Sequence, residues 1–245
     1  MRQAVVRRAQ DLSPSVRGFE LGCLDGQPFE FAAGQWVNLQ VPVAAGLDKR
    51  AYSIASPPYG ASATPAVNGA GPGQFEVAVT HVVEGNVSPA LYALDEGAVL
   101  EFEGPFGFFT REGLEREPAL FVGTGTGVCP LRSMILDELG RNAEGPPLRL
   151  LLGCRTQADI LYRAEFEALA QRYARFQFEA SLSRPEPGWT GRSGYVQTQL
   201  ANLIDPARRP HVYVCGLSRM ITEVRKTLKG ELGYDRKLIH SERYD

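Results

Sequence analysis

Two arginines, several hydroxyl side chains and a tyrosine stand close together in the segment SLSRPEPGWTGRSGY. Two prolines and three glycines break this segment into a loop. The residues of this segment that could bind a ligand are Ser183, Arg184, Arg192, Ser193 and Tyr195. Guanidinium groups bind phosphate through charge-assisted hydrogen bonds, and aromatic rings stack on flat rings. The pattern indicates a pocket for an anion that carries a flat ring, and a solvated charged loop is the alternative.

A cluster of glycines follows an apolar run in LFVGTGTGVCPLRS. Gly123, Gly125 and Gly127 stand between an expected strand and an expected helix. Glycines there let backbone N–H groups approach a phosphate closely, and the helix N-terminus favours negative charge. Two interpretations stay open: a cradle for a pyrophosphate, or a tight structural turn.

Two segments of the first half carry similar chemistry. In RAYSIASPP, Arg50 and Tyr52 share one face of an expected strand, and Ser53 lies on the other face. In EGNVSPAL, Gly85 and Ser88 open an expected short helix whose start offers N–H groups to a phosphate. An ordinary charged strand edge is the alternative for the first segment.

The segment VYVCGLSRM places Cys215 and Gly216 at the carboxyl end of an expected buried strand. In an open α/β sheet this end of a strand faces the ligand crevice. Cys215 is therefore either a residue that lines an active site or a buried, inert thiol.

The secondary-structure elements that position these residues follow two different sequence patterns, one in each half of the chain. Residues 1–113 contain short runs rich in β-branched and aromatic residues, separated by turn residues, which is typical of an antiparallel barrel or sandwich. Residues 114–245 alternate apolar strands with helical patterns, which is typical of a parallel sheet covered on both faces. We predict two domains: an N-terminal antiparallel β-barrel, residues 1–113, and an α/β parallel-sheet domain, residues 114–245.

The composition, with 44% hydrophobic and 22% charged residues, is that of a folded globular protein. No apolar run approaches the roughly 20 residues of a membrane span, and the N-terminus lacks a signal-peptide core, so we expect a cytoplasmic protein. The net charge is −5 over residues 1–113 and +3 over residues 114–245, which favours the second half as host of an anionic ligand and does not indicate nucleic-acid binding. The four cysteines lack cluster spacing, so we expect no metal site.

Taken in order, seven motifs of the chain resemble those of the ferredoxin–NADP⁺ reductase family, in particular its bacterial ferredoxin/flavodoxin reductases. The motifs are RAYS, EGNVS, GPFG, GTGTGVCPLRS, SR…TGRSGY, CG and the terminal ERY. The resemblance covers essentially the whole chain. It implies an antiparallel barrel that binds FAD, followed by a domain that binds NADP(H) as substrate.

The resemblance also implies roles for individual residues. Four are expected at the reaction centre: Ser53 and Glu242 in a proton relay, Cys215 beside the nicotinamide, and Tyr244 stacked on the flavin until the nicotinamide enters. The residues expected to bind FAD or NADP(H) are Arg50, Ala51, Tyr52, Ser53, Thr80, Val82, Gly85, Asn86, Val87, Ser88, Gly123, Thr124, Thr126, Gly127, Arg155, Ser183, Arg184, Arg192, Tyr195, Cys215, Gly216 and Tyr244.

For the opening loop, the resemblance implies that Ser183, Arg184, Arg192 and Tyr195 hold the 2′-phosphate and adenine of NADP(H). An NAD site would offer a carboxylate to the free ribose hydroxyl. No carboxylate stands in the matched positions, and Glu186 is the nearest one along the chain. The loop therefore predicts a preference for NADPH.

The implied activity is that of an FAD-dependent ferredoxin or flavodoxin–NADP⁺ reductase, which exchanges hydride with NADP(H) and single electrons with a carrier. An NAD(P)H-dependent flavin reductase, the reductase component of an oxygenase and a non-catalytic electron-relay subunit are the alternatives. Some features depart from the family pattern. Thr80 and His81 stand where many members have Lys or Arg, Cys129 replaces a small residue, and Asp245 follows Tyr244.

A ferredoxin or flavodoxin is acidic, so its docking surface should be basic. The candidate residues are Arg7, Arg8, Arg225, Lys226, Lys229, Arg236 and Lys237. An ordinary solvated helix face is the alternative interpretation. We expect a monomer that binds neither a membrane nor nucleic acid.

Overall fold

The computed structural model describes residues 1–43, 46–60, 71–205 and 207–244; Asp245, singled out above, lies outside this part. The chain divides into two compact units. Unit 1 comprises residues 1–111 and 132–141, and unit 2 comprises residues 112–131 and 142–245. The division runs through helix α2 (Val128–Arg141), most of which belongs to unit 1. The border predicted between residues 113 and 114 stays a prediction.

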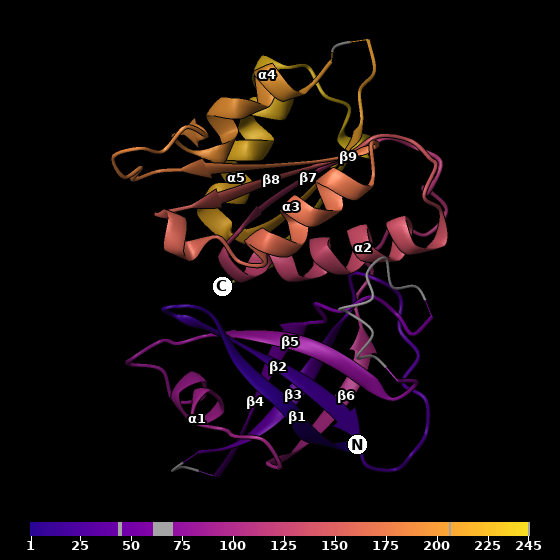
Figure 1. Cartoon of the computed structure of the whole chain (residues 1–245), viewed down its shortest axis with the longest axis vertical. Helices are drawn as coiled ribbons and strands as arrows, with labels where there is room; N and C mark the ends of the chain where they lie inside the picture. The colour runs from indigo at the N-terminus through magenta and orange to yellow at the C-terminus, as the bar shows by residue number, and fades with distance from the viewer. Residues whose placement is uncertain (44–45, 61–70, 206, 245) are drawn as a thin grey trace. The chain divides into compact units, whose positions relative to one another are not determined.

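Unit 1 is built on a six-stranded antiparallel sheet in the order β4-β3-β6-β1-β2-β5 (Figure 1). An antiparallel bridge between Ile54 and Val77 links the two edges of this sheet, as in a closed barrel. The predicted antiparallel architecture is thus confirmed. The strands are β1 (Arg2–Ser13), β2 (Val16–Cys23), β3 (Trp36–Val43), β4 (Gly46–Ser53), β5 (Gln74–Thr80) and β6 (Val99–Phe106).

The core of unit 1 follows from the alternation of its strands. In β6, Leu100 and Phe102 are buried, whereas Glu101 between them is half-buried. The ring of Phe102 packs 5.2 Å from that of Phe29 and 5.0 Å from that of Phe75, measured between centroids. Burying a phenylalanine stabilises a fold by about 1.5–3 kcal/mol, so this aromatic cluster is a large part of what holds the strands together.

Helix α1 (Ser88–Tyr92) is the short helix that the sequence predicts. Pro89 occupies its first turn, where the missing N–H costs nothing. Leu91 is buried in the same core cluster as Val87, which precedes the helix. This packing fixes the loop before α1 against the strands.

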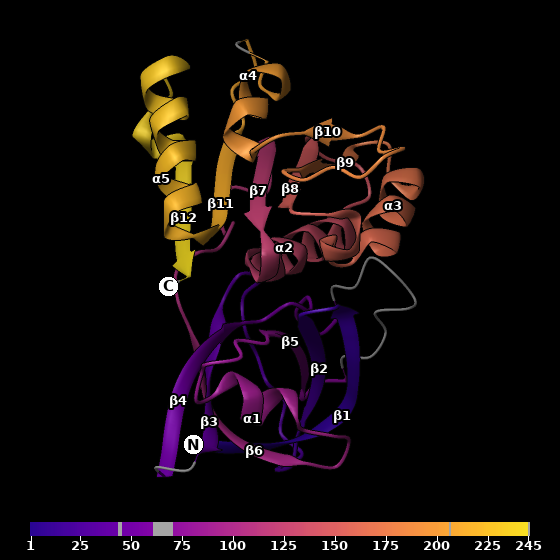
Figure 2. The same ribbon diagram turned by 90° about the vertical axis from the view of Figure 1, so that its left-hand side faces the viewer.

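Unit 2 is built on a six-stranded parallel sheet in the order β10-β9-β8-β7-β11-β12 (Figure 2). The predicted parallel sheet is confirmed. The strands are β7 (Ala119–Thr124), β8 (Leu148–Cys154), β9 (Phe176–Leu182), β10 (Arg192–Ser193), β11 (His211–Leu217) and β12 (Ile239–Tyr244). Because all strands run the same way, their carboxyl ends share one edge of the sheet.

Helices cover both faces of this sheet. Helix α3 (Arg163–Arg172) packs Phe166 against Phe178 of β9, with ring centroids 5.2 Å apart. Helices α4 (Leu200–Leu203) and α5 (Ser218–Lys226) lie on the opposite face from α3 (Figure 1). Ile221 and Val224 of α5 share a buried cluster with strands β7 and β11. Within the described residues, no helix is both long and apolar enough to cross a membrane.

The part of α2 that belongs to unit 1 is held by buried polar groups. Arg132 donates from Nη1 to the Ala55 carbonyl at 2.8 Å and to Glu76 Oε2 at 3.0 Å. The Ser133 hydroxyl donates to the Ser56 carbonyl at 2.7 Å. The segment that follows β4 is therefore fixed by side chains of the helix.

Candidate functional site

Strand β4 presents the residues that the sequence assigns to a flavin. Arg50 and Ala51 are exposed, Tyr52 is half-buried against the core cluster, and Ser53 is buried. Arg50 donates to Asp48 Oδ1 at 2.6 Å and keeps about half of its side chain in solvent. Burial raises the pKa of Tyr52 to about 12 although the Arg50 charge acts in the opposite direction, so its hydroxyl stays neutral at physiological pH.

The loop between β5 and α1 holds the second group of predicted flavin ligands. Thr80, Val82 and Asn86 are exposed, and Gly85 donates its N–H to the Val82 carbonyl at 2.9 Å. The Ser88 hydroxyl accepts from the Val82 N–H at 3.0 Å and closes the loop.

The N–H groups of this loop fit an anion. Within the described chain, the backbone N–H groups of Asn86 and Val87 donate to no protein acceptor. They precede a helix without a side-chain cap. Backbone donors at a helix start suit a pyrophosphate, so the residues present fit FAD. His81 beside them is exposed and lies 4.7 Å from the Tyr92 ring, between centroids.

In unit 2 the register brings three predicted residues into one row. Cys215 of β11 lies between Gly123 of β7 and Glu242 of β12. Tyr244 is two residues beyond Glu242, and its side chain influences the pKa of the Cys215 thiol. Three of the four residues assigned to the reaction centre thus meet at the carboxyl edge of the sheet.

The environment of Cys215 keeps its thiol neutral. Burial raises the pKa of the Cys215 thiol well above its ordinary value, and the Glu242 carboxylate raises it further. The Tyr244 side chain lowers the pKa of this thiol, with a smaller effect. A protonated thiol is a poor nucleophile.

The glycine turn after β7 is packed so closely that a larger residue would not fit. A Cβ on Gly127 would lie 2.6 Å from the Cys215 carbonyl carbon and 2.7 Å from the Gly216 Cα. Gly216 has φ +143°, and a Cβ there would collide with the Thr124 hydroxyl. Thr124 Oγ1 is buried without a hydrogen-bond partner among the described residues. Gly125, in contrast, has open space on the side where a Cβ would stand, and this space together with the orphaned Thr124 hydroxyl fits the pyrophosphate of a dinucleotide. Thr126, in the same turn, is half-buried.

Cations follow three neighbouring strands at this edge. Arg155 follows β8, Arg184 follows β9 and Arg192 stands in β10. The Arg184 N–H donates to the Arg155 carbonyl at 2.9 Å, so these two segments run side by side. The Ser183 N–H donates to the Cys154 carbonyl at 2.9 Å, and the Tyr195 ring is 67% exposed. An exposed ring beside guanidinium groups can stack on a base.

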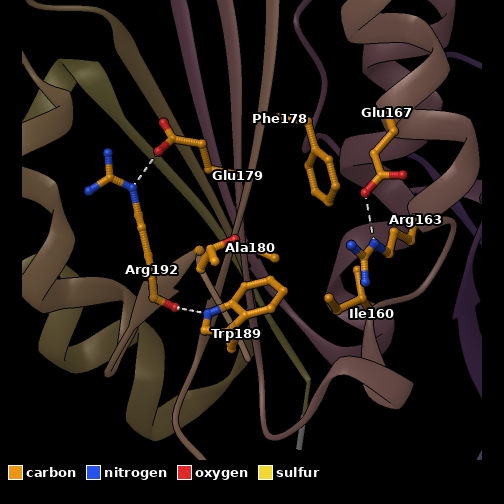
Figure 3. A pocket seen from close by; sticks show the side chains of 10 residues that line it. Ile160, Arg163, Glu167, Phe178, Glu179, Ala180, Trp189 and Arg192 are labelled. Carbon is orange, nitrogen blue, oxygen red and sulfur yellow. Dashed lines mark hydrogen bonds and ion pairs between the residues drawn. The ribbon is translucent and has the colours of Figure 1, made fainter. Parts of the chain in front are cut away.

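A carboxylate that the sequence analysis missed meets this cluster. Arg192 Nε donates to Glu179 Oε2 at 2.5 Å, and both side chains line an open pocket of roughly 490 Å³ (Figure 3). Glu186, the nearest carboxylate along the chain, accepts instead from the Gln157 N–H at 3.4 Å. The signal for Glu179 was its place between Phe178 and Ala180 in a strand, which predicts that it points away from their face.

Cys154, at the end of β8, supplies a prediction about pH. Burial raises the pKa of this thiol from 9.0 to about 12, with a smaller contribution from Asp159. Below pH 9 the thiol is protonated in both states; above it, the unfolded chain ionises first. Stability should therefore fall from pH 9 to 12, by roughly 1 kcal/mol at pH 10 from this group. The test is urea unfolding of the wild type and of Cys154→Ala at pH 7.5 and at pH 10. Between these pH values the free energy of unfolding should fall by roughly 1 kcal/mol less in Cys154→Ala than in the wild type. An equal fall in both proteins would contradict the raised pKa of Cys154.

Comparisons with known proteins match the two parts of the chain to two different domain families. A family model for an oxidoreductase FAD-binding domain matches residues 3–110, and one for an oxidoreductase NAD-binding domain matches residues 121–226. The chain is 47% identical over 242 residues to ferredoxin–NADP reductase B of Sorangium cellulosum, covering 96% of this chain and 93% of the relative. The chain belongs to the ferredoxin–NADP reductase family. It is an oxidoreductase with an FAD-binding and an NAD-binding domain.

Another relative is longer than this chain. The phenol hydroxylase P5 protein of Acinetobacter pittii is 33% identical over 99% of this chain, which spans only 65% of that relative. The FAD/NAD-binding domain of nitric oxide dioxygenase from Vibrio cholerae has the same fold, with a TM-score of 0.84, 24% identity and coverage of 99% and 98% of the two chains. In the described residues, no group of three His, Cys, Asp or Glu side chains is placed to hold a metal ion.

Proposed function

We propose that this protein is an FAD-dependent ferredoxin–NADP⁺ reductase that prefers NADPH to NADH. The observation that carries the proposal is the succession of Arg155, Arg184 and Arg192 along the carboxyl edge of the unit 2 sheet. A 2′-phosphate distinguishes NADPH from NADH, and guanidinium groups are its strongest side-chain partners. The name of the 47% identical relative supports the same activity.

The residues of unit 1 would hold FAD by its phosphates and its ring. Arg50 offers an exposed guanidinium, the loop before α1 offers the N–H groups of Asn86 and Val87, and Tyr52 offers a neutral aromatic face. When bound, FAD supplies the ability to accept two electrons together and to release them singly.

The residues of unit 2 would bind and orient the coenzyme. Gly125 leaves open space for its pyrophosphate, and Thr124 Oγ1, which has no hydrogen-bond partner among the described residues, would supply a hydrogen bond to it. The uncharged sulfur of Cys215 would contact the nicotinamide and set its position at the edge of the sheet. Glu242 and Ser53 would accept and return a proton at their side-chain oxygens, and Tyr244 would cover the ring until the coenzyme enters.

The electron acceptor we propose is an acidic carrier protein, ferredoxin or flavodoxin. Lys226, Lys229, Arg236 and Lys237 are exposed on α5 and the turns after it, and opposite charge would steer such a carrier to them. Arg225 is half-buried and donates to the Ser241 hydroxyl at 3.4 Å. The candidates of unit 1, Arg7 and Arg8, are exposed, and Arg8 pairs with Glu20 at 3.4 Å.

A second candidate is the NADH-dependent reductase of an oxygenase. The Glu179 carboxylate on Arg192 favours it, because that charge opposes a 2′-phosphate. The 33% identity to a phenol hydroxylase component points the same way.

The deciding experiment is stopped-flow reduction of the FAD-loaded protein by NADPH and by NADH, followed by transfer to ferredoxin. We expect bleaching of the flavin band by NADPH at least about a hundredfold more efficient than by NADH, and reduction of ferredoxin at the same enzyme concentration. Preference for NADH would transfer the proposal to the second candidate, and no reduction by either coenzyme would reject both.

A further inference from the structure

The guanidinium of Arg192 is already paired within unit 2. Its Nε donates to Glu179 Oε2 at 2.5 Å, and its Nη1 donates to Gln199 Oε1 at 3.3 Å. Its backbone carbonyl accepts from the Trp189 indole N–H at 2.8 Å. Arg192 is thus held at both backbone and side chain, and only its Nη2 edge makes no hydrogen bond to the described chain.

Glu179 has a second cation within reach. Arg149 Nε lies 3.9 Å from Glu179 Oε1, while its guanidinium also binds the Gln177 side chain. The two carboxylate oxygens therefore face different arginines. If Arg192 turns towards a phosphate, the Glu179 charge still has Arg149 beside it, so breaking the first pair leaves no isolated charge.

We propose that Glu179 is a specificity-determining residue that competes with the coenzyme 2′-phosphate for Arg192 and so narrows the preference for NADPH. The inference rests on the proposed function, because it assumes that Arg192 contacts the 2′-phosphate. Glu179 occupies the Nε of this guanidinium, so a phosphate that binds Arg192 either displaces Glu179 or binds the open Nη2 beside a like charge. In both cases Glu179 weakens the binding of the phosphate. NADH lacks this phosphate, so Glu179 does not weaken its binding.

The pocket offers a matched control. Glu167 lines the same cavity as Glu179, but pairs with Arg163 at 2.7 Å (Figure 3). Its substitution removes the same charge from the same pocket without touching Arg192. An effect that follows local charge alone would therefore appear in both variants.

The test measures binding of adenosine 2′,5′-bisphosphate and of 5′-AMP to the FAD-loaded protein by calorimetry. Glu179→Gln should tighten the bisphosphate Kd by about five- to tenfold and leave the 5′-AMP Kd within about twofold. Glu167→Gln should change neither Kd. In an Arg192→Gln background, the gain from Glu179→Gln should fall below about twofold, because the contested partner is gone.

Three results would overturn the inference: a weaker bisphosphate Kd in Glu179→Gln, an unchanged one, or an equal gain with and without Arg192. These are separate from failure of the proposed function. If Arg192→Gln alone leaves the bisphosphate Kd unchanged, or if neither nucleotide binds, the assignment of the coenzyme site itself is wrong.

Discussion

Replacing Arg184 and Arg192 together by glutamine should lower kcat/KM for NADPH by about 10²–10⁴, because each charge-assisted hydrogen bond to phosphate contributes about 1.5–3 kcal/mol. The kcat/KM for NADH should stay within about threefold, since that coenzyme carries no 2′-phosphate. The two single variants should differ. Arg184 is exposed, whereas Arg192 already donates a hydrogen bond to Glu179. Arg184→Gln should therefore lower kcat/KM for NADPH more than Arg192→Gln does.

The measurement is the initial rate of flavin reduction over a range of NADPH and NADH concentrations. Arg163→Gln is the matched control, since this arginine lines the same pocket as Arg192 but pairs with Glu167. It should leave the NADPH to NADH ratio within about twofold. An unchanged ratio in the double variant would mean that the arginines of the loop are solvated, and that the preference for NADPH has another origin.

Much of the fold could be predicted because strand and helix periods are written locally in the chain. The alternation in β6 and the helical spacing of Ile221, Val224 and Leu228 need no partner to be recognised. Strand β1 was not predicted, because arginines interrupt it. Ala4 and Val6 are its buried hydrophobic positions, and Arg7 and Arg8, which follow them, are exposed. Strand β10 has two residues, too few for any period.

The same distinction, between features within one segment and features that join two segments, applies to the candidate site. Motifs that lie within one segment, such as the glycines after β7, could be placed at the carboxyl edge once a parallel sheet was expected. The pairing of Glu179 with Arg192 could not, because it joins two segments through the register of β9 and β10. Strand alternation predicts which face Glu179 occupies, but only the arrangement of neighbouring strands decides which cation it meets.

Removing one partner of the buried ion pair between Arg132 and Glu76 should have the largest effect on stability. The side chains are only 5% and 10% exposed, so Arg132→Leu would leave the Glu76 charge buried. That costs about 3–5 kcal/mol of the free energy of unfolding. The variant should also retain less FAD, because Arg132 and Ser133 bind the carbonyls of Ala55 and Ser56, just after the proposed flavin strand.

Urea unfolding and the FAD content of the purified protein test this prediction. Arg141→Ala is the control on the same helix: its pair with Asp137 leaves the arginine 63% exposed, so the loss should stay below about 1 kcal/mol. Replacing both buried partners, Glu76→Leu with Arg132→Leu, should recover most of the stability, because neither member of the pair is then left as an unpaired buried charge. A loss below about 1 kcal/mol in Arg132→Leu, or none recovered in the double variant, would show that packing rather than the buried charge sets the stability of this helix contact.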